Sequence, residues 1–290
     1  MSEAGIKPRT TSGPRYMWYQ LTRSPLTMVG LIIVVIILAL VIFAPVFATH
    51  EPNAIDLRAR LAAPSAAHFF GTDEVGRDIY SRILYGGRQS IAVGFFVVVV
   101  AGLIGTMIGA VSGLAGGWAD TITMRIMDVV LSVPSLVLIM ALAAALGPSL
   151  INAAIAIAIV RIPFYVRLSR GQALLVRELP YVAAARTFRA GRWHILRWHI
   201  LPNILSPVVV QATLDIGNTI LLAAALSFIG LGAQQPAAEW GAMVSTGRNY
   251  ILDQWWYSGF PGFAILITAT AFNLFGDGVR DILDPKQKAR

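Results

Sequence analysis

Residues 89–119 read QSIAVGFFVVVVAGLIGTMIGAVSGLAGGWA, a stretch in which no side chain carries a charge. A helix needs about 20 apolar residues to cross the hydrocarbon core of a bilayer, so this stretch is long enough to span it. Comparable uncharged stretches occupy residues 24–49, 129–160 and 254–276. The sequence therefore predicts an all-α, polytopic membrane protein.

The composition of the whole chain agrees with this class. Of its 290 residues, 56% are hydrophobic and only 13% are charged, whereas an ordinary soluble domain has roughly 25% charged residues. The chain has no cysteine, so it lacks the disulfide framework on which small secreted modules depend. These numbers exclude a soluble globular enzyme, a disordered protein and a disulfide-rich secreted module.

The net charge of +8 is unevenly distributed along the chain. Eight of the 23 Lys and Arg residues fall within 161–197, four precede residue 24 and four follow residue 277. Cytoplasmic segments of membrane proteins carry an excess of Lys and Arg, so these three regions are predicted to be cytoplasmic. Segments 49–88 and 230–258 are neutral or slightly acidic and are predicted to face outward.

The hydrophobic pattern predicts six transmembrane helices with both termini in the cytoplasm. The predicted organisation is a cytoplasmic tail (1–27), a first transmembrane helix (28–48), an extracytoplasmic segment (49–88), a core domain (89–279) and a second cytoplasmic tail (280–290). The core is expected to contain five transmembrane helices, at about 89–112, 122–146, 149–169, 203–229 and 259–279, and a cytoplasmic loop at about 170–202.

Small residues recur at every fourth position of the second predicted helix, at Ala101, Gly105, Gly109, Gly113 and Gly117. This spacing places them on one helix face, where small side chains let two helix backbones approach closely in lipid. The pattern favours packing between helices of the same chain over an interface with another subunit.

Residues that would mark an enzyme or a metal site are scarce. The chain lacks the G-x-x-x-x-G-K-[ST] phosphate-binding loop, and its only lysines are Lys7, Lys286 and Lys288, so it is not expected to hydrolyse ATP. His194 and His199 do not form an HExxH pattern, and no cysteine is present to support a transition-metal site. We therefore expect no catalytic residue and no metal site.

Two charged residues, Arg161 and Asp215, fall inside predicted transmembrane helices at similar depths. A charge at the bilayer centre costs about 2.5–3.5 kcal/mol on insertion scales and usually faces a partner or a water-filled path. We expect that the two residues pair with each other or line a solute path. A local pairing of each, or a side chain that reaches back to the membrane interface, is an equally open alternative.

Four stretches resemble the permease subunits of bacterial dipeptide, oligopeptide and nickel ABC importers, and the resemblance covers nearly the whole chain. They are FGTDEVGRD (70–78, followed by Ser81 and Arg82), YVAAARTFRAGRWHILRWHILPN (181–203), LSFIGLGAQQPAAEWGAM (226–243) and NLFGDGVRDILDP (273–285). Within that family, THEPNAIDL (49–57), VRIPFYVRLSRGQAL (160–174) and GRNYILDQWWY (247–257) look most similar to the subunit for dipeptides of the D-alanyl-D-alanine type.

The resemblance implies the architecture of a type I ABC importer permease and a function in peptide import. The implied partners are a second homologous permease, two ATP-binding subunits and an extracytoplasmic peptide-binding protein, with no role for nucleic acid. ATP and Mg would bind to the partner subunits, and this chain would bind no cofactor. Trp240, Trp255 and Trp256 are expected to anchor the outer segment at the membrane interface, or as a second possibility to contact a partner.

Residues 181–203 are similar to the cytoplasmic EAA loop, which in this family docks into a cleft on the ATP-binding subunit. Two positions depart from the motif: Ala183 replaces its Glu and Arg189 replaces its Gly. We expect weaker coupling through this subunit, and we expect Gly191 to take over the turn because a non-glycine residue is disfavoured at positive φ. The coupling residues implied by the resemblance are Tyr181, Ala183, Ala184, Ala185, Arg186, Phe188, Arg189, Ala190, Gly191 and Arg192.

Two other functions are compatible with a polytopic helical chain. A stand-alone secondary carrier or channel for small solutes would need inverted repeats and broken helices near the midplane, and no internal repeat is evident. A non-transporting assembly subunit would have little use for charges inside its transmembrane helices. A permease subunit of an ATP-driven peptide importer is the favoured interpretation.

Overall fold

The structure, a computed structural model, describes residues 24–283. Within this part of the chain the regular elements are helices, and β pairing is limited to one isolated bridge between Thr72 and Asp78. The predicted all-α class is confirmed. Most of the two predicted tails, 1–27 and 280–290, lies outside the described residues.

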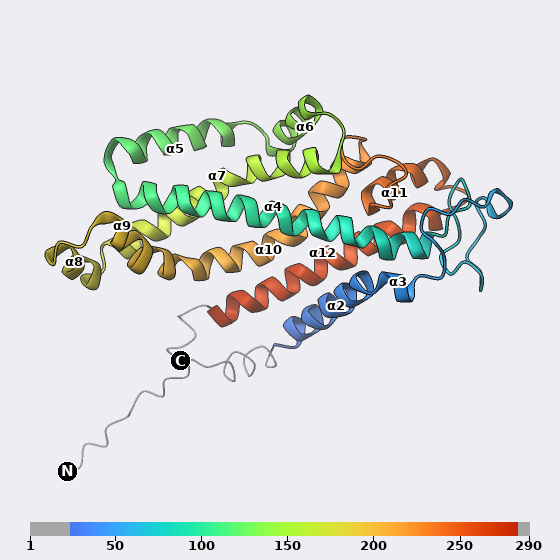
Figure 1. The fold of residues 1–290 in the computed structure, drawn as a ribbon, viewed down its shortest axis with the longest axis horizontal. Coiled ribbons are helices and arrows are strands. Elements are labelled where there is room, and N and C mark those ends of the chain that lie inside the picture. Colours follow the sequence, from blue (N-terminus) through green and yellow to red (C-terminus); the bar gives the residue numbers. More distant parts are fainter. Residues whose placement is uncertain (1–23, 284–290) are drawn as a thin grey trace, which may run out of the picture.

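The long helices lie side by side and form an elongated bundle (Figure 1). One end of the bundle, hereafter the α8 end, carries α8 and α9, while the opposite end, hereafter the α11 end, carries α11 and the irregular segment 48–78. In chain order the elements are α2 (Pro25–Ile42), α3 (Ala44–Phe47), η1 (Leu57–Ala59), α4 (Ile79–Ala115), α5 (Gly117–Ser132), α6 (Ser135–Leu146), α7 (Leu150–Arg177), α8 (Pro180–Thr187), α9 (Arg192–Ile195), the π-helical η2 (Leu196–Ile200), α10 (Leu201–Phe228), α11 (Trp240–Gly247), η3 (Arg248–Tyr250) and α12 (Trp256–Leu283).

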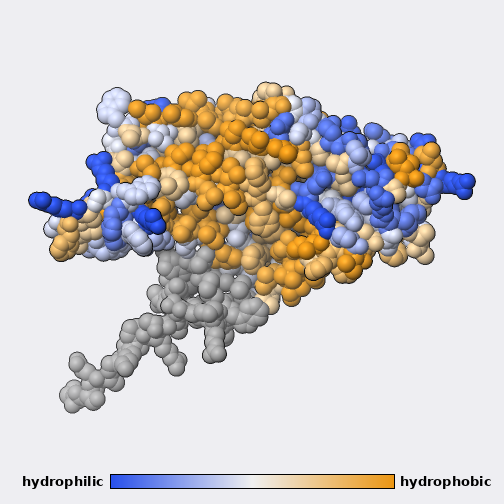
Figure 2. Space-filling model, in the orientation of Figure 1, coloured by the Kyte–Doolittle hydropathy of each residue, from blue (hydrophilic) through white to orange (hydrophobic). Residues whose placement is uncertain are grey.

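Five helices of the described chain are long and apolar enough to cross a membrane. Figure 2 shows hydrophobic residues over the middle of the bundle and hydrophilic residues gathered at both of its ends, as a membrane-embedded molecule requires. The five candidates are Pro25–Ile42, Ile79–Ala115, Leu150–Arg177, Arg192–Phe228 and Trp256–Asp281.

The transmembrane helix predicted at about 122–146 is not continuous, because α5 and α6 meet there at an angle of 89°. Pro134 lies between them, and Val133 before it is extended, with φ −89° and ψ 136°. Proline lacks the N–H that would continue a helix and disfavours the helical conformation of the residue before it. The sixth crossing of the membrane, if α5 and α6 supply one, is therefore a broken helix.

Charges on α5 keep it beside α7. Asp120 Oδ1 lies 2.6 Å from Arg170 Nε, and Asp128 Oδ1 lies 2.6 Å from Arg167 Nη2. Both arginines belong to the part of α7 that leads toward the α8 end. The sequence carried a signal of this arrangement, because Asp120 and Asp128 precede the uncharged stretch, which begins only at residue 129.

α4 begins at Ile79, well before the predicted start at residue 89. Asp78 caps it by accepting a hydrogen bond from the Ser81 N–H at 2.8 Å, which satisfies one of the free donors of the first turn. Arg88 donates to the carbonyls of Val41 and Ile42 at 2.9 and 2.8 Å, at the end of α2. Arg88 therefore stabilises the junction of α2 and α4, and α4 continues through this charged residue.

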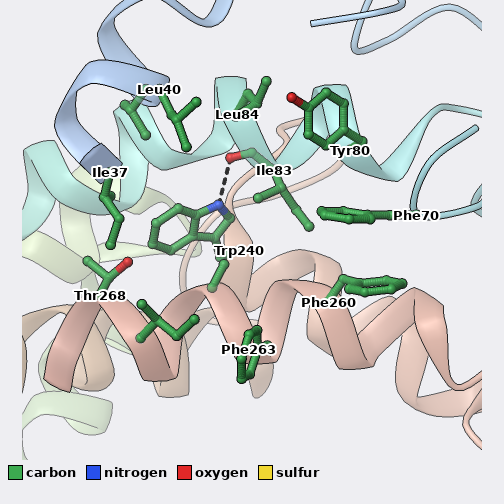
Figure 3. Close-up of a pocket in the computed structure, with 13 residues that line it drawn as sticks. Ile37, Leu40, Phe70, Tyr80, Ile83, Leu84, Trp240, Phe260, Phe263 and Thr268 are labelled. Carbon is green, nitrogen blue, oxygen red and sulfur yellow. Dashed lines mark hydrogen bonds between the residues drawn. The ribbon is translucent and has the colours of Figure 1, made fainter. Parts of the chain in front are cut away.

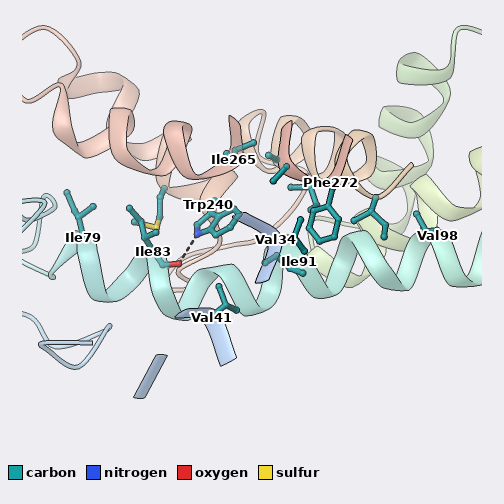
Figure 4. Packing of buried hydrophobic residues seen from close by; sticks show 14 of the residues in the cluster. Val34, Val41, Ile79, Ile83, Ile91, Val98, Trp240, Ile265 and Phe272 are labelled. Carbon is teal, nitrogen blue, oxygen red and sulfur yellow. Dashed lines mark hydrogen bonds between the residues drawn. The ribbon is translucent and has the colours of Figure 1, made fainter. Parts of the chain in front are cut away.

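Trp240 lies in the hydrophobic core that joins α2, α4, α11 and α12 (Figure 4). Its indole N–H donates to the Ile83 carbonyl at 2.8 Å, and its side chain is buried. The prediction of an interfacial anchor or partner contact is therefore wrong for Trp240, whereas Trp255 is exposed. The indole also borders an apolar groove of about 240 Å³, whose lining includes Ile37, Leu40, Phe70, Ile83, Phe260 and Phe263 (Figure 3).

Glycines of α4 bring its backbone close to α7. A Cβ atom on Gly109 would lie 2.3 Å from the Val166 carbonyl oxygen, and one on Gly105 would lie 2.5 Å from Tyr165 Cβ. Gly113 likewise faces α7, but Gly117 lies beyond the end of α4 and would meet no atom within 4 Å. Three of the four glycines singled out from the sequence thus belong to this packing surface, and Gly117 does not.

Replacement of Gly109 by alanine is expected to destabilise the protein by about 1–3 kcal/mol, the usual cost of overpacking. The backbone carbonyl it would strike cannot move without shifting α7. Thermal unfolding of the purified protein in detergent measures the effect. Gly171→Ala on α7 is the matched control, because nothing lies within 4 Å of its Cβ position, and it should be neutral or stabilising. Equal unfolding temperatures for the two variants would contradict the prediction.

Candidate functional site

α8 is a short helix held against the bundle by one buried side chain. Pro180 opens it at a position where proline is well tolerated, and Val182 is fully buried. The remaining surface of the helix is largely open: Tyr181 is exposed, and the Phe188 side chain at its end is 87% exposed. α8 therefore leaves aromatic surface exposed at the end of the bundle.

The structure brings the ten predicted coupling residues together in one helix and turn. Tyr181, Ala183, Ala184, Ala185 and Arg186 belong to α8, and Phe188 is its C-cap residue. The turn that follows consists of Arg189 and Ala190, and it leads to Gly191 and Arg192 at the start of α9.

Arg189 itself makes the turn after α8, with φ +59°. Its N–H donates to the Arg186 carbonyl at 2.9 Å, and the Ala190 N–H donates to the Ala185 carbonyl at 3.0 Å. This pair of bonds is the Schellman motif, whose left-handed residue is usually glycine. Gly191 has φ −65°, so the expectation that it takes over the turn is wrong. The end of α8 fixes the left-handed position, and Gly191 comes too late in the chain.

Replacement of Arg189 by glycine is expected to stabilise the turn by about 1 kcal/mol, because a left-handed conformation costs a residue with a Cβ roughly that much. Hydrogen exchange followed by mass spectrometry should show about fivefold slower exchange in peptides that cover residues 185–190. Gly191→Ala is the control, since its φ is ordinary. Faster exchange in the glycine variant would show that the arginine side chain contributes more than its backbone costs.

Beside α8 lies a cavity of about 440 Å³ with a basic lining. Arg177, Arg186 and Arg192 line it, with Glu178 as the one acidic residue among its lining side chains. Arg177 is held in place by donating to the Gly113 carbonyl at 2.8 Å. Three guanidinium groups around one cavity favour contact with carboxylates, which each of them can bind in a bidentate way.

A second candidate site lies inside the bundle, where Arg161 of α7 meets Asp215 of α10. Arg161 Nη2 lies 2.6 Å from Asp215 Oδ1, and the side chains are 24% and 2% exposed. The two residues therefore pair with each other, and the alternatives of local pairing and of reaching the interface are excluded by this geometry. Tyr165 completes the group by donating its hydroxyl to Asp215 Oδ2 at 3.2 Å.

Sequence reasoning missed Tyr165, although a signal was present. Tyr165 follows Arg161 by one helical turn, and residues at this spacing lie on the same helix face. A buried carboxylate needs more than one hydrogen-bond donor to offset the loss of its water. An aromatic hydroxyl one turn from the arginine was the available donor.

The motif at 70–78 ties together the segments of the α11 end. Asp73 accepts hydrogen bonds from the backbone N–H of Val75 and Arg77 at 3.0 and 2.9 Å. Arg82 is almost fully buried and donates to the Pro52 carbonyl at 3.0 Å and the Ala237 carbonyl at 3.3 Å. The arginine thus joins the segment before α4 to the loop before α11.

Glu74 makes the stability of this motif depend on pH. Its carboxylate accepts a hydrogen bond from the Tyr257 hydroxyl. Burial raises the pKa of the Glu74 carboxyl above its usual value of 4.5. The native state then holds a proton more tightly than the unfolded chain, so this contribution to stability is fully present below about pH 4.5 and is lost as pH rises through the raised folded value.

Glu74→Gln removes this titration and keeps an oxygen that accepts the bond from Tyr257. Relative to the variant, the parent is expected to lose unfolding temperature as pH is raised from about 4.5 to 7. Thermal unfolding in detergent at several pH values measures the difference. The exposed Glu51 supplies the control Glu51→Gln, which should keep the pH profile of the parent. Identical profiles for parent and Glu74→Gln would contradict the prediction.

Comparison with known proteins places the chain in a family. Residues 105–289 match the model of the binding-protein-dependent transport system inner membrane component, and residues 15–64 match the N-terminal TM domain of oligopeptide transport permease C. The chain is 66% identical over 275 residues to a probable D,D-dipeptide transport system permease protein of Escherichia coli K12, covering 95% of this chain and 92% of the relative.

Two further relatives are similar over comparable lengths. A dipeptide transport system permease protein of Alkalihalophilus pseudofirmus is 46% identical, covering 95% of this chain and 90% of the relative. A glutathione transport system permease protein of Pectobacterium atrosepticum is 42% identical, covering 98% and 95%. These relatives are permease subunits of transport systems and not enzymes. The similarity therefore favours a permease subunit over a stand-alone carrier or channel. The protein belongs to the family of binding-protein-dependent transport system inner membrane components, as an inner-membrane permease subunit of an ABC importer.

Proposed function

We propose that this chain forms half of the translocation path of an ATP-driven importer for dipeptides or short peptides, including D,D-dipeptides. A second homologous permease forms the other half, two ATP-binding subunits supply ATP and Mg, and an extracytoplasmic peptide-binding protein delivers the substrate. The 66% identity to a probable D,D-dipeptide permease supports the substrate class. No cofactor is assigned to this chain.

The exposed surface of α8 is the observation that carries the proposal. Phe188 is 87% exposed, and the basic cavity of Arg177, Arg186 and Arg192 lies beside the helix. Exposed aromatic surface beside a cavity lined by arginines has a composition that is enriched at protein interfaces. On this proposal α8 is the docking element for an ATP-binding subunit. The excess of arginine at this end supports a cytoplasmic location for α8, and the Lys and Arg residues of the two sequence tails support the same side for both termini.

The connection between α8 and α7 suits the transmission of motion. Only Glu178 and Leu179 separate the two helices, so a displacement of α8 is passed to α7 and to Arg161 on it. ATP binds better to the closed arrangement of its subunits, and this differential affinity shifts the permease between inward-open and outward-open states. Ala183 leaves α8 without the carboxylate of the related motif, so the second permease carries part of the coupling.

The pair of Arg161 and Asp215 borders the path of the peptide. Arg161 is partly exposed, and its Nε is buried without a hydrogen-bond partner in the described part of the chain. The exposed part of this guanidinium suits the carboxylate of a zwitterionic peptide. Asp215 holds this guanidinium in place through the ion pair.

Proteoliposomes that contain the complete complex test the proposal. Uptake of labelled D-Ala-D-Ala and of L-Ala-L-Ala is measured with and without ATP inside the vesicles and with and without the binding protein. We expect uptake of D-Ala-D-Ala that requires both ATP and the binding protein. Uptake without ATP would overturn the importer mechanism. ATP-dependent uptake of the L,L-dipeptide alone would overturn the D,D-dipeptide assignment and leave the mechanism standing.

A further inference from the structure

Two histidines and an aspartate that are distant in sequence converge at the α11 end. His50, His68 and Asp78 each offer one ligand atom, and these atoms lie within 4.8 Å of one another. Asp78 Oδ1 lies 2.9 Å from His68 Nδ1 and 3.8 Å from His50 Nδ1. The transport path and the α8 surface do not use this cluster.

Neighbouring groups hold the three residues of this cluster in place. Asp78 Oδ2 accepts the Ser81 N–H at 2.8 Å, which leaves Oδ1 directed at the histidines. The backbone N–H of His50 donates to Ser81 Oγ at 3.0 Å, and the backbone N–H of His68 donates to Ser65 Oγ at 3.2 Å, so both histidines are held through their main chain. The bond to the Asp78 carboxylate is of the kind that orients a ligand at metal sites, where the loss of such a supporting group typically costs 10–100-fold in metal affinity.

We propose that His50, His68 and Asp78 bind a divalent transition-metal ion of the zinc type. Two imidazoles and one carboxylate form a ligand set that Zn²⁺ prefers, and a fourth position remains for water. Bonds of 2.0–2.1 Å in tetrahedral geometry separate two ligand atoms by about 3.3 Å. The distances of 2.9 and 3.8 Å from Asp78 Oδ1 to the two histidine nitrogens lie on either side of that value. Side-chain shifts of less than about 1 Å therefore bring both distances to the tetrahedral separation.

The environment of the site fits a reversible metal ion. The Asp78 side chain is 1% exposed, whereas that of His50 is 41% exposed, so an ion enters from the side of His50. His50 lies just after α3, His68 lies in the irregular segment, and Asp78 caps α4. A bound ion therefore links three parts of the chain at the α11 end and stabilises their arrangement, because it binds the folded chain and not the unfolded one.

Metal binding is measured on the full-length protein purified in detergent through a tag that contains no histidine. After treatment with a chelator, the protein is titrated calorimetrically with Zn²⁺, and the visible absorption of bound Co²⁺ reports the coordination geometry. We expect one ion per chain, a tetrahedral Co²⁺ spectrum and a rise in unfolding temperature on addition of Zn²⁺. His50→Ala and His68→Ala should each lower the affinity at least tenfold.

Asp78→Asn, His50→Ala and a double histidine control keep the result interpretable. Asp78→Asn retains an oxygen for the Ser81 N–H and should still lose the ion, while the exposure of His50 makes His50→Ala safe for folding. His194→Ala combined with His199→Ala removes an equal number of histidines at the α8 end and should bind Zn²⁺ as the parent does. No bound ion in the parent, or equal affinity in the parent and in both His50→Ala and Asp78→Asn, would overturn the proposal in favour of a hydrogen-bonded cluster without metal.

Discussion

Replacement of Asp215 by alanine is expected to abolish peptide uptake and to lower the free energy of unfolding by about 3 kcal/mol. The change leaves the Arg161 guanidinium without its partner inside the bundle, and breaking a buried ion pair from one side costs about 3–5 kcal/mol. The lower end of that range applies because Arg161 is 24% exposed. Unfolding in detergent measures the stability, and proteoliposomes of the complete complex measure uptake.

Two further variants separate the ion pair from its surroundings. Tyr165→Phe keeps the pair and removes only one hydrogen bond to Asp215, so it should cost about 1 kcal/mol. Exchange of the charges in Arg161→Asp with Asp215→Arg should recover part of the uptake that either single change removes. Uptake at the level of the parent in Asp215→Ala would exclude the pair from the transport mechanism, and no recovery in the exchanged variant would limit its role to one fixed orientation.

Five of the six predicted transmembrane helices follow from apolar length, because the bilayer leaves few other solutions for a hydrophobic chain. The stretch at about 122–146 is the exception, since α5 and α6 meet there at an angle. Helix starts were harder to predict. The predicted start at residue 89 rests on the uncharged stretch that follows Arg88, yet the guanidinium groups of Arg82 and Arg88, both within α4, find backbone carbonyls from other segments. Such carbonyl acceptors lie far away in sequence, so they cannot be identified from residue spacing.

The same reason divides the candidate sites into predictable and unpredictable parts. A pair of Arg161 and Asp215 was one of the alternatives that the sequence left open, because the two residues were predicted to lie at similar depths in the membrane. His50, His68 and Asp78 lie in the predicted extracytoplasmic segment, where membrane depth does not relate one residue to another. Their separations match no metal-binding motif. Only the folded chain brings them together.

Local backbone chemistry limited the prediction at the end of α8. The sequence shows that Arg189 occupies a position where the related motif has glycine, but it does not show whether the turn moves or the residue accepts the strain. The structure keeps the turn, with Arg189 at φ +59°. The hydrogen bonds from Arg189 and Ala190 back to α8 are therefore stronger constraints than the preference of one residue.

Replacement of Phe188 by alanine is expected to lower ATP-driven uptake at least tenfold while leaving the unfolding temperature unchanged. The side chain is 87% exposed, so its removal takes little packing from the bundle. A buried aromatic anchor at an interface is commonly worth 2 kcal/mol or more, and 1.4 kcal/mol already corresponds to a factor of ten. Copurification of the ATP-binding subunit and uptake in proteoliposomes measure the two consequences.

Trp118→Ala is the matched control for this experiment. Trp118 is 82% exposed and lies in the first turn of α5, near the same end of the bundle but not on α8 (Figure 1). If exposure of aromatic surface at this end serves only contact with lipid headgroups, both variants should behave alike. If α8 docks to an ATP-binding subunit, only Phe188→Ala should lose that subunit, and Phe188→Tyr should retain it because the aromatic area is kept. Equal losses in the two alanine variants would remove α8 from the coupling interface.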